Sequence, residues 1–500
     1  MHKVATMVRF FLCTTLLCSL GLSQAIAQGD AASQQHFDIA LESVLDEKGH
    51  VVLPEGFSGS IDPTGFQMVS KEGERPKFIR SGNPNDQWSE GEFGVPGCSA
   101  QVNAAVVISG ELFLGGFFQA CRFAATSNIA RLDPSTGEFS ALGDGVNSTV
   151  FALAAIDTDL YVGGQFSQAG GAAANRIAKF DTTQTGNAGW SALGDGVNSF
   201  VYALAAIGTD LYVGGFFTQA GGAAASNIAK FDTTQTGTAG WSALGDGMND
   251  AVFALSAIGS DLYVGGDFTQ AGGAAASNIA KFDTTQTGNA GWSALGDGVN
   301  SDVRAFAAIG TDLYVGGQFI QAGGAAANRI AKFDTTQSGN AGWSALGDGV
   351  NNGVRALAAI GTDLYVGGFV TQAGGAAASN IAKFDTTQTG NAGWSALGDG
   401  VNSNVQALAA IGTDLYVGGF FSQAGGAAAS NIAKFDTTQT GNAGWSALGD
   451  GVNSNVQALA AIGTDLYVGG FFSQAGGAAA SNIAKFDTTQ TGNAGWSALG

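Results

Sequence analysis

The stretch Leu211-Tyr212-Val213-Gly214-Gly215 decides the fold, because it recurs at a fixed interval along the chain. Copies begin 51 residues apart, at Leu160, Leu211, Leu262, Leu313, Leu364, Leu415 and Leu466. A weaker copy, Leu112-Phe113-Leu114-Gly115-Gly116, begins 48 residues before the first. Self-similarity at a fixed period of this length is the signature of a repeat architecture. Eight units therefore fill residues 101–500, and the last two are identical over residues 400–449 and 451–500.

Each unit contains four short apolar runs that are separated by residues typical of turns. In the unit of Leu211 these runs are 201–207, 211–213, 228–231 and 241–244. Each has the length of a strand and is bounded by Gly, Asp, Asn or Thr. None has the length or the 3.6-residue period of an amphipathic helix. The segment 221–225 is rich in alanine, but its glycine doublet opposes a helix and predicts a loop.

Four antiparallel strands in each of eight units predict an all-β fold, a β-propeller of eight four-stranded blades. One such sheet cannot bury both of its faces, whereas sheets packed around an axis bury them against one another. An open β-solenoid is the alternative, but its coils are usually about 20–30 residues long. The chain ends at Gly500, inside the turn that follows the fourth run elsewhere. A longer array of repeats is therefore a further alternative to a closed eight-unit ring.

Residues 1–27 have the features of a secretory signal peptide. A basic start with Lys3 and Arg9 precedes an apolar stretch, and Ala25-Ile26-Ala27 forms a small-x-small cleavage site. The apolar stretch is shorter than the roughly 20 residues that a membrane span needs. We therefore expect export, to the medium or the cell surface, without a transmembrane segment.

Residues 28–100 differ from the repeats in composition, with more charge and more of the prolines. We expect this N-terminal segment to be partly irregular. Trp88-Ser89 precedes the first repeat as Trp190-Ser191 precedes a later one. Trp88 is therefore predicted to mark an outer strand that straps the ring closed.

The composition limits the classes of partner. The chain has 20 basic and 40 acidic residues, for a formal charge of −20. Nucleic acid is excluded as a partner, because its binding relies on Lys and Arg at the phosphates. A monomer is expected.

The repeats resemble the kelch family. Their order of an apolar strand, a Leu-Tyr-Val strand and a glycine pair is that of a kelch unit, and Asp133-Pro134-Ser135-Thr136 followed by Phe139 matches its later segment. The other units depart from the pattern, since Asp232-Thr233-Thr234 replaces Asp-Pro and the distance from Asp232 to Trp241 is three residues longer. The resemblance covers about four-fifths of the chain. It implies a propeller fold, but it names no activity, because kelch-like propellers range from scaffolds to oxidases.

Strand alternation sorts the loops between two faces of the ring. One face is predicted to combine the connections between units with the loops between second and third strands, and propellers usually bind ligands there. The connections place an aspartate in each unit, and a ring of carboxylates attracts cations. Two interpretations stay open, turn formation by Asp-Gly and Asn or binding of calcium or a cationic ligand. The candidate residues are Asp144, Asp195, Asp246, Asp297, Asp348, Asp399 and Asp450.

Two repeat positions vary while their neighbours stay fixed. The first is Phe151, Tyr202, Phe253, Arg304, Arg355, Gln406 and Gln457. The second, directly after the glycine pair, is Phe117, Gln165, Phe216, Asp267, Gln318, Phe369, Phe420 and Phe471. Positions free of packing constraints vary, so these residues are candidates for a ligand-facing rim, with neutral drift as the alternative. Arg304 and Arg355 join the aspartates as candidate rim residues.

No catalytic residue is identified. The three histidines, His2, His36 and His50, all precede the repeats, so the ring has no histidine for a metal site or a triad. No resident cofactor is expected, with calcium as the open alternative. The favoured function is an exported, non-catalytic binding module for a protein, a glycan or a cell-surface partner. The alternatives are a secreted hydrolase or lyase that uses rim carboxylates, and a purely structural surface spacer.

After removal of the signal peptide, Cys98 and Cys121 are the remaining cysteines. Two cysteines in an exported chain suggest one disulfide. Alignment on Leu112 places Cys98 at the position of Val146, in a connection between units, and Cys121 at the position of Ala169, in the loop after the second strand. Because both segments are predicted on one face, a Cys98–Cys121 bond is expected.

Overall fold

The computed structural model describes residues 39–40, 61–62, 66–69, 77–80, 97–122 and 124–499. The chain divides into two compact units, residues 1–93 and 94–500. In the first unit, β1 (Ile39–Ala40) pairs parallel with β2 (Ile61–Asp62), and β3 (Phe66–Val69) pairs antiparallel with β4 (Lys77–Arg80). The predicted signal peptide, residues 1–27, and the predicted strap at Trp88 lie outside the described residues.

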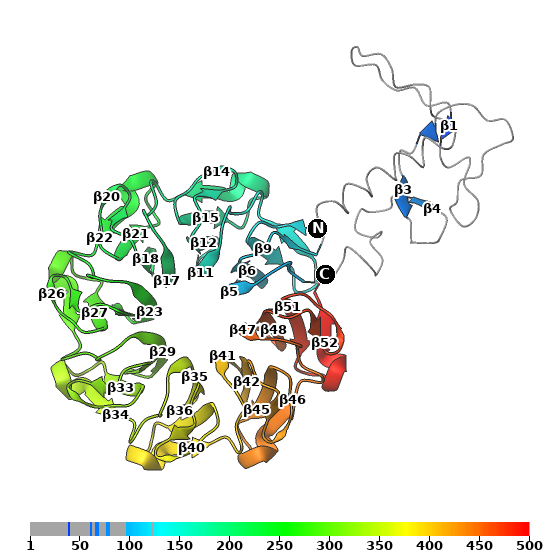
Figure 1. Ribbon diagram of the computed structural model, residues 1–500. Helices are drawn as coiled ribbons and strands as arrows, with labels where there is room; N and C mark the ends of the chain where they lie inside the picture. The colour runs from blue at the N-terminus through cyan, green and yellow to red at the C-terminus, as the bar shows by residue number, and fades with distance from the viewer. Residues whose placement is uncertain are drawn as a thin grey trace, which may run out of the picture. The chain divides into compact units, whose positions relative to one another are not determined.

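The second unit is a ring of eight four-stranded antiparallel sheets, which confirms the predicted all-β, eight-bladed propeller. Each blade comes from one repeat, and its strands run in chain order from the centre of the ring to its edge (Figure 1). We number the blades 1 to 8 along the chain. The outermost strands of blades 1 and 8 both come from their own repeats, so each of these two blades is complete with four strands.

The strands occupy equivalent positions in every blade. The innermost strands are β5 (Val102–Ile108), β11 (Val150–Ile156), β17 (Val201–Ile207), β23 (Val252–Ile258), β29 (Val303–Ile309), β35 (Val354–Ile360), β41 (Val405–Ile411) and β47 (Val456–Ile462). The second strands are β6 (Glu111–Gly116), β12 (Asp159–Gly164), β18 (Asp210–Gly215), β24 (Asp261–Gly266), β30 (Asp312–Gly317), β36 (Asp363–Gly368), β42 (Asp414–Gly419) and β48 (Asp465–Gly470). The third strands are β9 (Ile129–Leu132), β15 (Ile177–Asp181), β21 (Ile228–Asp232), β27 (Ile279–Asp283), β33 (Ile330–Asp334), β39 (Ile381–Asp385), β45 (Ile432–Asp436) and β51 (Ile483–Asp487). The outer strands are β10 (Phe139–Ala141), β16 (Trp190–Ala192), β22 (Trp241–Ala243), β28 (Trp292–Ala294), β34 (Trp343–Ala345), β40 (Trp394–Ala396), β46 (Trp445–Ala447) and β52 (Trp496–Ala498).

The segments predicted as loops contain small regular elements. In blade 3 the alanine-rich loop forms a hairpin of β19 (Gln219–Ala220) and β20 (Ala223–Ala224), because Gly221 and Gly222 adopt the positive φ angles of a tight turn. Blades 2 to 8 also carry one 3₁₀ turn each before the outer strand, from η3 (Gly186–Gly189) to η9 (Gly492–Gly495), at the outer edge of the ring (Figure 1). No helix in the described part of the chain is long and apolar enough to cross a membrane.

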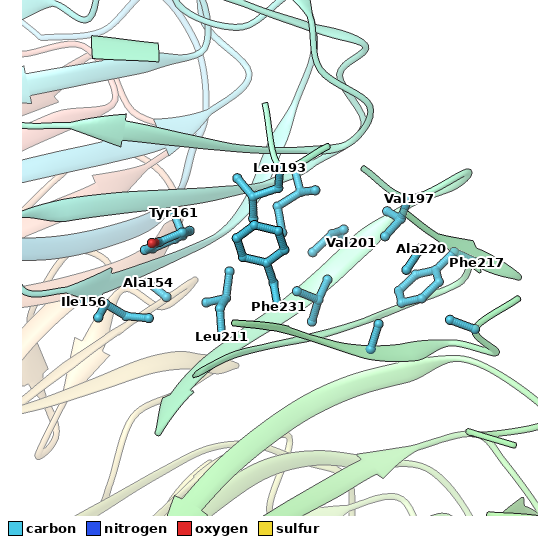
Figure 2. Close-up of a cluster of buried hydrophobic side chains, with 14 residues drawn as sticks. Ala154, Ile156, Tyr161, Leu193, Val197, Val201, Leu211, Phe217, Ala220 and Phe231 are labelled. Carbon is cyan, nitrogen blue, oxygen red and sulfur yellow. The ribbon is translucent and has the colours of Figure 1, made fainter. Parts of the chain in front are cut away.

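The core consists of the layers between neighbouring blades. In the layer between blades 2 and 3, Tyr161 of β12 contacts the side chains around Leu211 and Phe231 of blade 3 (Figure 2). Tyr212, the next residue after Leu211, belongs instead to the layer between blades 3 and 4. Because successive side chains of a strand point to opposite faces, the Leu-Tyr-Val string supplies both layers at once. This explains why every unit needs it.

In blades 2 to 8, a tryptophan fixes the blade to the preceding connection. The Trp241 ring meets the Phe231 ring edge-on, with centroids 5.2 Å apart. Its indole Nε1 donates a hydrogen bond of 2.6 Å to the carbonyl oxygen of Leu193, which precedes the blade. Tyr212, Phe231 and Trp241 therefore all pack between or within the blades. Lys230 is half-buried and forms an ion pair of 2.9 Å with Asp210.

The ring closes between blades 8 and 1. The amide of Cys98 donates to the carbonyl oxygen of Ser481 over 2.6 Å, and the Asn482 side chain donates to the carbonyl oxygen of Cys98 over 2.7 Å. Tyr467 of blade 8 shares a buried layer with Leu112 of blade 1. The described chain therefore forms a closed ring of eight blades.

Candidate functional site

One face of the ring gathers the segments that vary between units. Val197, in the connection before blade 3, pairs with Ala220 of the hairpin that follows the second strand. The innermost strand begins and the second strand ends on this same face, since the amide of Phe216 donates to the carbonyl oxygen of Phe200 over 2.9 Å. The alternation of strands predicted this grouping of loops. This face surrounds one end of the central channel, and we call that end of the channel the mouth.

A β-bulge presents the first variable position of every blade at the mouth. In blade 3, Val201 pairs with Gly215 and Ala203 with Gly214, so that Tyr202 is an extra residue without a partner across the sheet. The same shift occurs in all eight innermost strands. A bulge re-aims the side chain of its extra residue. The sequence analysis identified the variable residues but not the bulge that positions them.

The glycine pair makes this bulge sterically possible. A Cβ atom at Gly215 would overlap the carbonyl oxygen of Phe200, and one at Gly214 would lie 2.5 Å from the Val252 side chain of blade 4. Neither glycine has a positive φ. The close backbone approach therefore accounts for both of them.

The eight bulge residues form a closed series around the channel, which we call the mouth ring. None of them is buried. The series begins with an amide in blade 1, continues with three aromatic residues and two arginines, and ends with two amides. Its members are Asn103, Phe151, Tyr202, Phe253, Arg304, Arg355, Gln406 and Gln457.

Neighbouring members of the mouth ring contact one another or flanking residues. The Tyr202 ring lies with its centroid 5.7 Å from that of Phe151 and 5.8 Å from that of Phe253. On the opposite part of the ring, the Asn455 side chain donates to Oε1 of Gln406 over 3.4 Å. The mouth is therefore divided into an aromatic, a cationic and an amide sector.

The cationic sector holds two arginines and one carboxylate. Arg304 Nε forms an ion pair of 2.6 Å with Asp302. The Arg355 guanidinium lies 5.0 Å from the centre of the Phe369 ring, within the range of a cation–π contact. Burial lowers the pKa of Arg355, and the nearby charge of Arg304 lowers it further. The structure thus brings together the two arginines that the sequence identified as candidates.

The candidate aspartates lie in the connections on this face, after the outer strands and two residues before the residue that pairs with the hairpin. Asp246 is held by the 3₁₀ turn of the next blade, where Asn289 donates to its carboxylate over 2.7 Å and accepts a bond of 2.7 Å from its amide. Both bonds recur at Asp144 with Asn187. Six of the seven aspartates accept such a bond from the next blade, and the seventh, Asp195, faces Thr238 instead of an asparagine.

The asparagines that follow these aspartates are also occupied. Asn198 Oδ1 accepts bonds of 2.9 Å and 3.1 Å from the amides of Thr218 and Gln219, and its Nδ2 donates to the Thr218 hydroxyl. These bonds fasten the connection to the hairpin, as a turn-forming role requires. Within residues 97–122 and 124–499, no three His, Cys, Asp or Glu side chains are grouped as a metal site would need. Calcium binding at the aspartates stays a prediction.

The two cysteines occupy the position of a recurring contact. Cys98 and Cys121 form a disulfide with Cα atoms 3.9 Å apart. The equivalent pair in blade 2, Val146 and Ala169, makes the same backbone bridge without a covalent bond. The disulfide therefore joins the connection and the hairpin of blade 1, directly beside the closure with blade 8.

No family model matches this chain, and no curated protein matches it. Among solved structures, the computationally designed Ika8 protein is 18% identical over 75% of this chain and 95% of its own, with a TM-score of 0.49. A chain in the crystal structure of the mitotic checkpoint complex is 16% identical over 62% of this chain and 83% of its own, with a TM-score of 0.39. Both likenesses are too low to indicate a function.

Proposed function

We propose that this protein is an exported, non-catalytic binding module, a divergent kelch-like propeller that holds a protein or glycan partner at the cell surface through the mouth face. The observation that carries the proposal is the placement of the variation between repeats. The units are nearly identical at packing positions, whereas the mouth ring and the residues after the glycine pairs differ from blade to blade. These differing residues come together on one face.

The chemistry of this face supports binding. Five phenylalanines that follow glycine pairs are between 42% and 59% exposed, and they surround the mouth ring. They are Phe117, Phe216, Phe369, Phe420 and Phe471. Aromatic residues and arginine are enriched in the energetically dominant parts of binding interfaces. A rigid ring that presents variable side chains on one face is a common design for binding proteins.

Two features support export. The signal peptide features of residues 1–27 direct a chain to secretion. The bond between Cys98 and Cys121 belongs to an oxidising compartment, because disulfides are rare in the cytosol.

The proposal is tested by probing glycan and protein arrays with the purified exported chain, with and without calcium. We expect at least one partner whose signal is lost in the variant Phe253→Gln/Arg355→Gln. Glutamine already occupies the equivalent positions of blades 7 and 8, so the variant is expected to fold. Arg329→Asn is the matched control, because six other units carry asparagine at that position. Absence of any partner would leave the spacer hypothesis, and turnover of an array glycan would favour the hydrolase or lyase.

A further inference from the structure

The aromatic and cationic sectors of the mouth ring meet at a cavity. A cavity of about 390 Å³ opens in the channel, and Phe253 and Arg304 both line it. Its remaining wall is largely apolar and includes Ala203, Leu204 and Leu255. Sites for small molecules are concave, mostly apolar and supplied with a few polar groups, and they usually occupy about 300–1,000 Å³. The size of this cavity fits that description, and its wall combines apolar side chains with polar surface.

Arg304, which lines this cavity, and its neighbour Arg355 in the next blade are incompletely neutralised. Each of the seven lysines in blades 2 to 8 forms an ion pair with an aspartate of the adjacent strand. Arg304 has Asp302, but Arg355 has no carboxylate partner among the described residues and contacts the Phe369 ring instead. Asp302 therefore pairs with one of these two neighbouring guanidiniums, and the charge of Arg355 has no ion-pair partner among the described residues. An anion that enters the mouth could therefore form an ion pair with Arg355.

The order of the sectors restricts the ligand further. The aromatic series Phe151, Tyr202 and Phe253 leads directly to Arg304 in the next blade. An anion alone would leave these exposed rings unused, and an apolar molecule without charge would leave Arg355 without a partner. A flat apolar body with one anionic group uses both sectors, because guanidinium binds carboxylate in a forked geometry while the rings cover the body.

We propose that the mouth binds a small apolar monoanion, an aromatic carboxylate in chemical class. Its carboxylate lies between Arg304 and Arg355, and its ring lies against Phe253 and the apolar wall of the cavity. This inference rests on the proposed function, because it assigns the ligand class of the same face. It also assigns distinct roles to the sectors, with charge recognition in blades 5 and 6 and apolar contact in blades 2 to 4.

The inference is tested by calorimetric titration of the exported chain with 2-naphthoate. The neutral 2-naphthalenemethanol and the small anion acetate serve as comparison probes. We expect 2-naphthoate to bind at least about ten-fold more tightly than either probe, since a charge-assisted hydrogen bond contributes on that scale. Arg355→Gln is expected to weaken 2-naphthoate about ten-fold and to leave the weak binding of 2-naphthalenemethanol unchanged. Phe253→Gln is expected to weaken both aromatic probes.

Arg329→Asn is again the control, because it removes one arginine outside the mouth ring and introduces the residue of six other units. It should leave every affinity unchanged. Equal affinity for 2-naphthoate and 2-naphthalenemethanol, or an equal loss in Arg329→Asn and Arg355→Gln, would overturn the inference. If 2-naphthoate does not bind while an array partner does so through the mouth, the ligand class is wrong and the proposed function stands. If neither binds, both fail.

Discussion

Thr238→Asn is expected to stabilise the ring, because it would add a contact that the other blades already have. In blade 4, Asn289 exchanges two hydrogen bonds of 2.7 Å with Asp246 of blade 3. Blade 3 carries Thr238 in place of this asparagine, opposite Asp195. Its 3₁₀ turn has the same geometry, with cap angles φ −121° and ψ 154° against −124° and 152° in blade 4. The substituted side chain would therefore meet Asp195 without rearrangement of the backbone.

The magnitude follows from the two bonds that would form. One intramolecular hydrogen bond contributes about 0.5–1.5 kcal/mol net, and an exposed site belongs to the lower end of that range. Ordering the asparagine side chain costs a fraction of a kcal/mol. We therefore expect the free energy of unfolding to rise by about 1 kcal/mol, which corresponds to roughly 1 °C in Tm for a domain of this size.

Urea unfolding followed by tryptophan fluorescence measures this change. The reverse substitution Asn289→Thr should lower the free energy of unfolding by about the same amount, about 1 kcal/mol. The double variant should return close to the wild-type value, because separate sites add. Thr238→Ala, which cannot form either bond, should bring no gain. A Thr238→Asn variant that is no more stable than Thr238→Ala would refute the reasoning.

Three further predictions concern the closure, the core and the bulge. Cys98→Val/Cys121→Ala, which introduces the residues of blade 2, should lower the free energy of unfolding by ~3 kcal/mol on the chain-entropy model. Hydrogen exchange should then increase first in blades 1 and 8. An even increase around the ring would contradict this prediction. Burial raises the pKa of six of the seven core tyrosines to about 12 and also raises that of the seventh, so stability should be complete below pH 10 and fall as the pH rises toward 12. In a Tyr202→Phe background, tyrosinate absorbance should appear together with unfolding, whereas ionisation of a ring that is still folded near pH 10 would argue against burial. Gly215→Ala should lower the free energy of unfolding in urea by about 1–3 kcal/mol. Gly353→Ala should leave it unchanged, because its new Cβ would have no neighbour nearer than 3.7 Å. Equal effects of the two substitutions would exclude the steric explanation.

The sequence determined the architecture because its period is long, regular and repeated. Four runs in each unit predicted the four strands, and the recurrence of the string around Tyr212 predicted the number of blades. The alternation of strands also placed Cys98 and Cys121 on one face, since that argument needs only the order of strands. These inferences depend on contacts within one unit or on topology.

The features that the sequence did not predict depend on contacts between blades. Asn289 and Asp246 are 43 residues apart, and neither type of residue signals a partner in the next unit. Their pairing fastens the aspartates, predicted as candidates for a rim site, to the 3₁₀ turn of the next blade. The bulge at Tyr202 was missed because strand length alone does not reveal an extra residue. The glycine pair at the end of the second strand, opposite the variable position, was the available signal.

The most direct test of the central claim is a variant with a uniform mouth. In this variant, all five aromatic and cationic members of the mouth ring are replaced by the glutamine that blades 7 and 8 carry. The affinity of the variant for the partner found on the arrays is measured by calorimetry, and its Tm is measured by thermal unfolding. If binding occurs through the mouth, the Tm stays close to that of the wild type and the affinity falls at least about 100-fold, as expected when several dominant contacts are removed. An unchanged affinity in a folded variant would contradict the account.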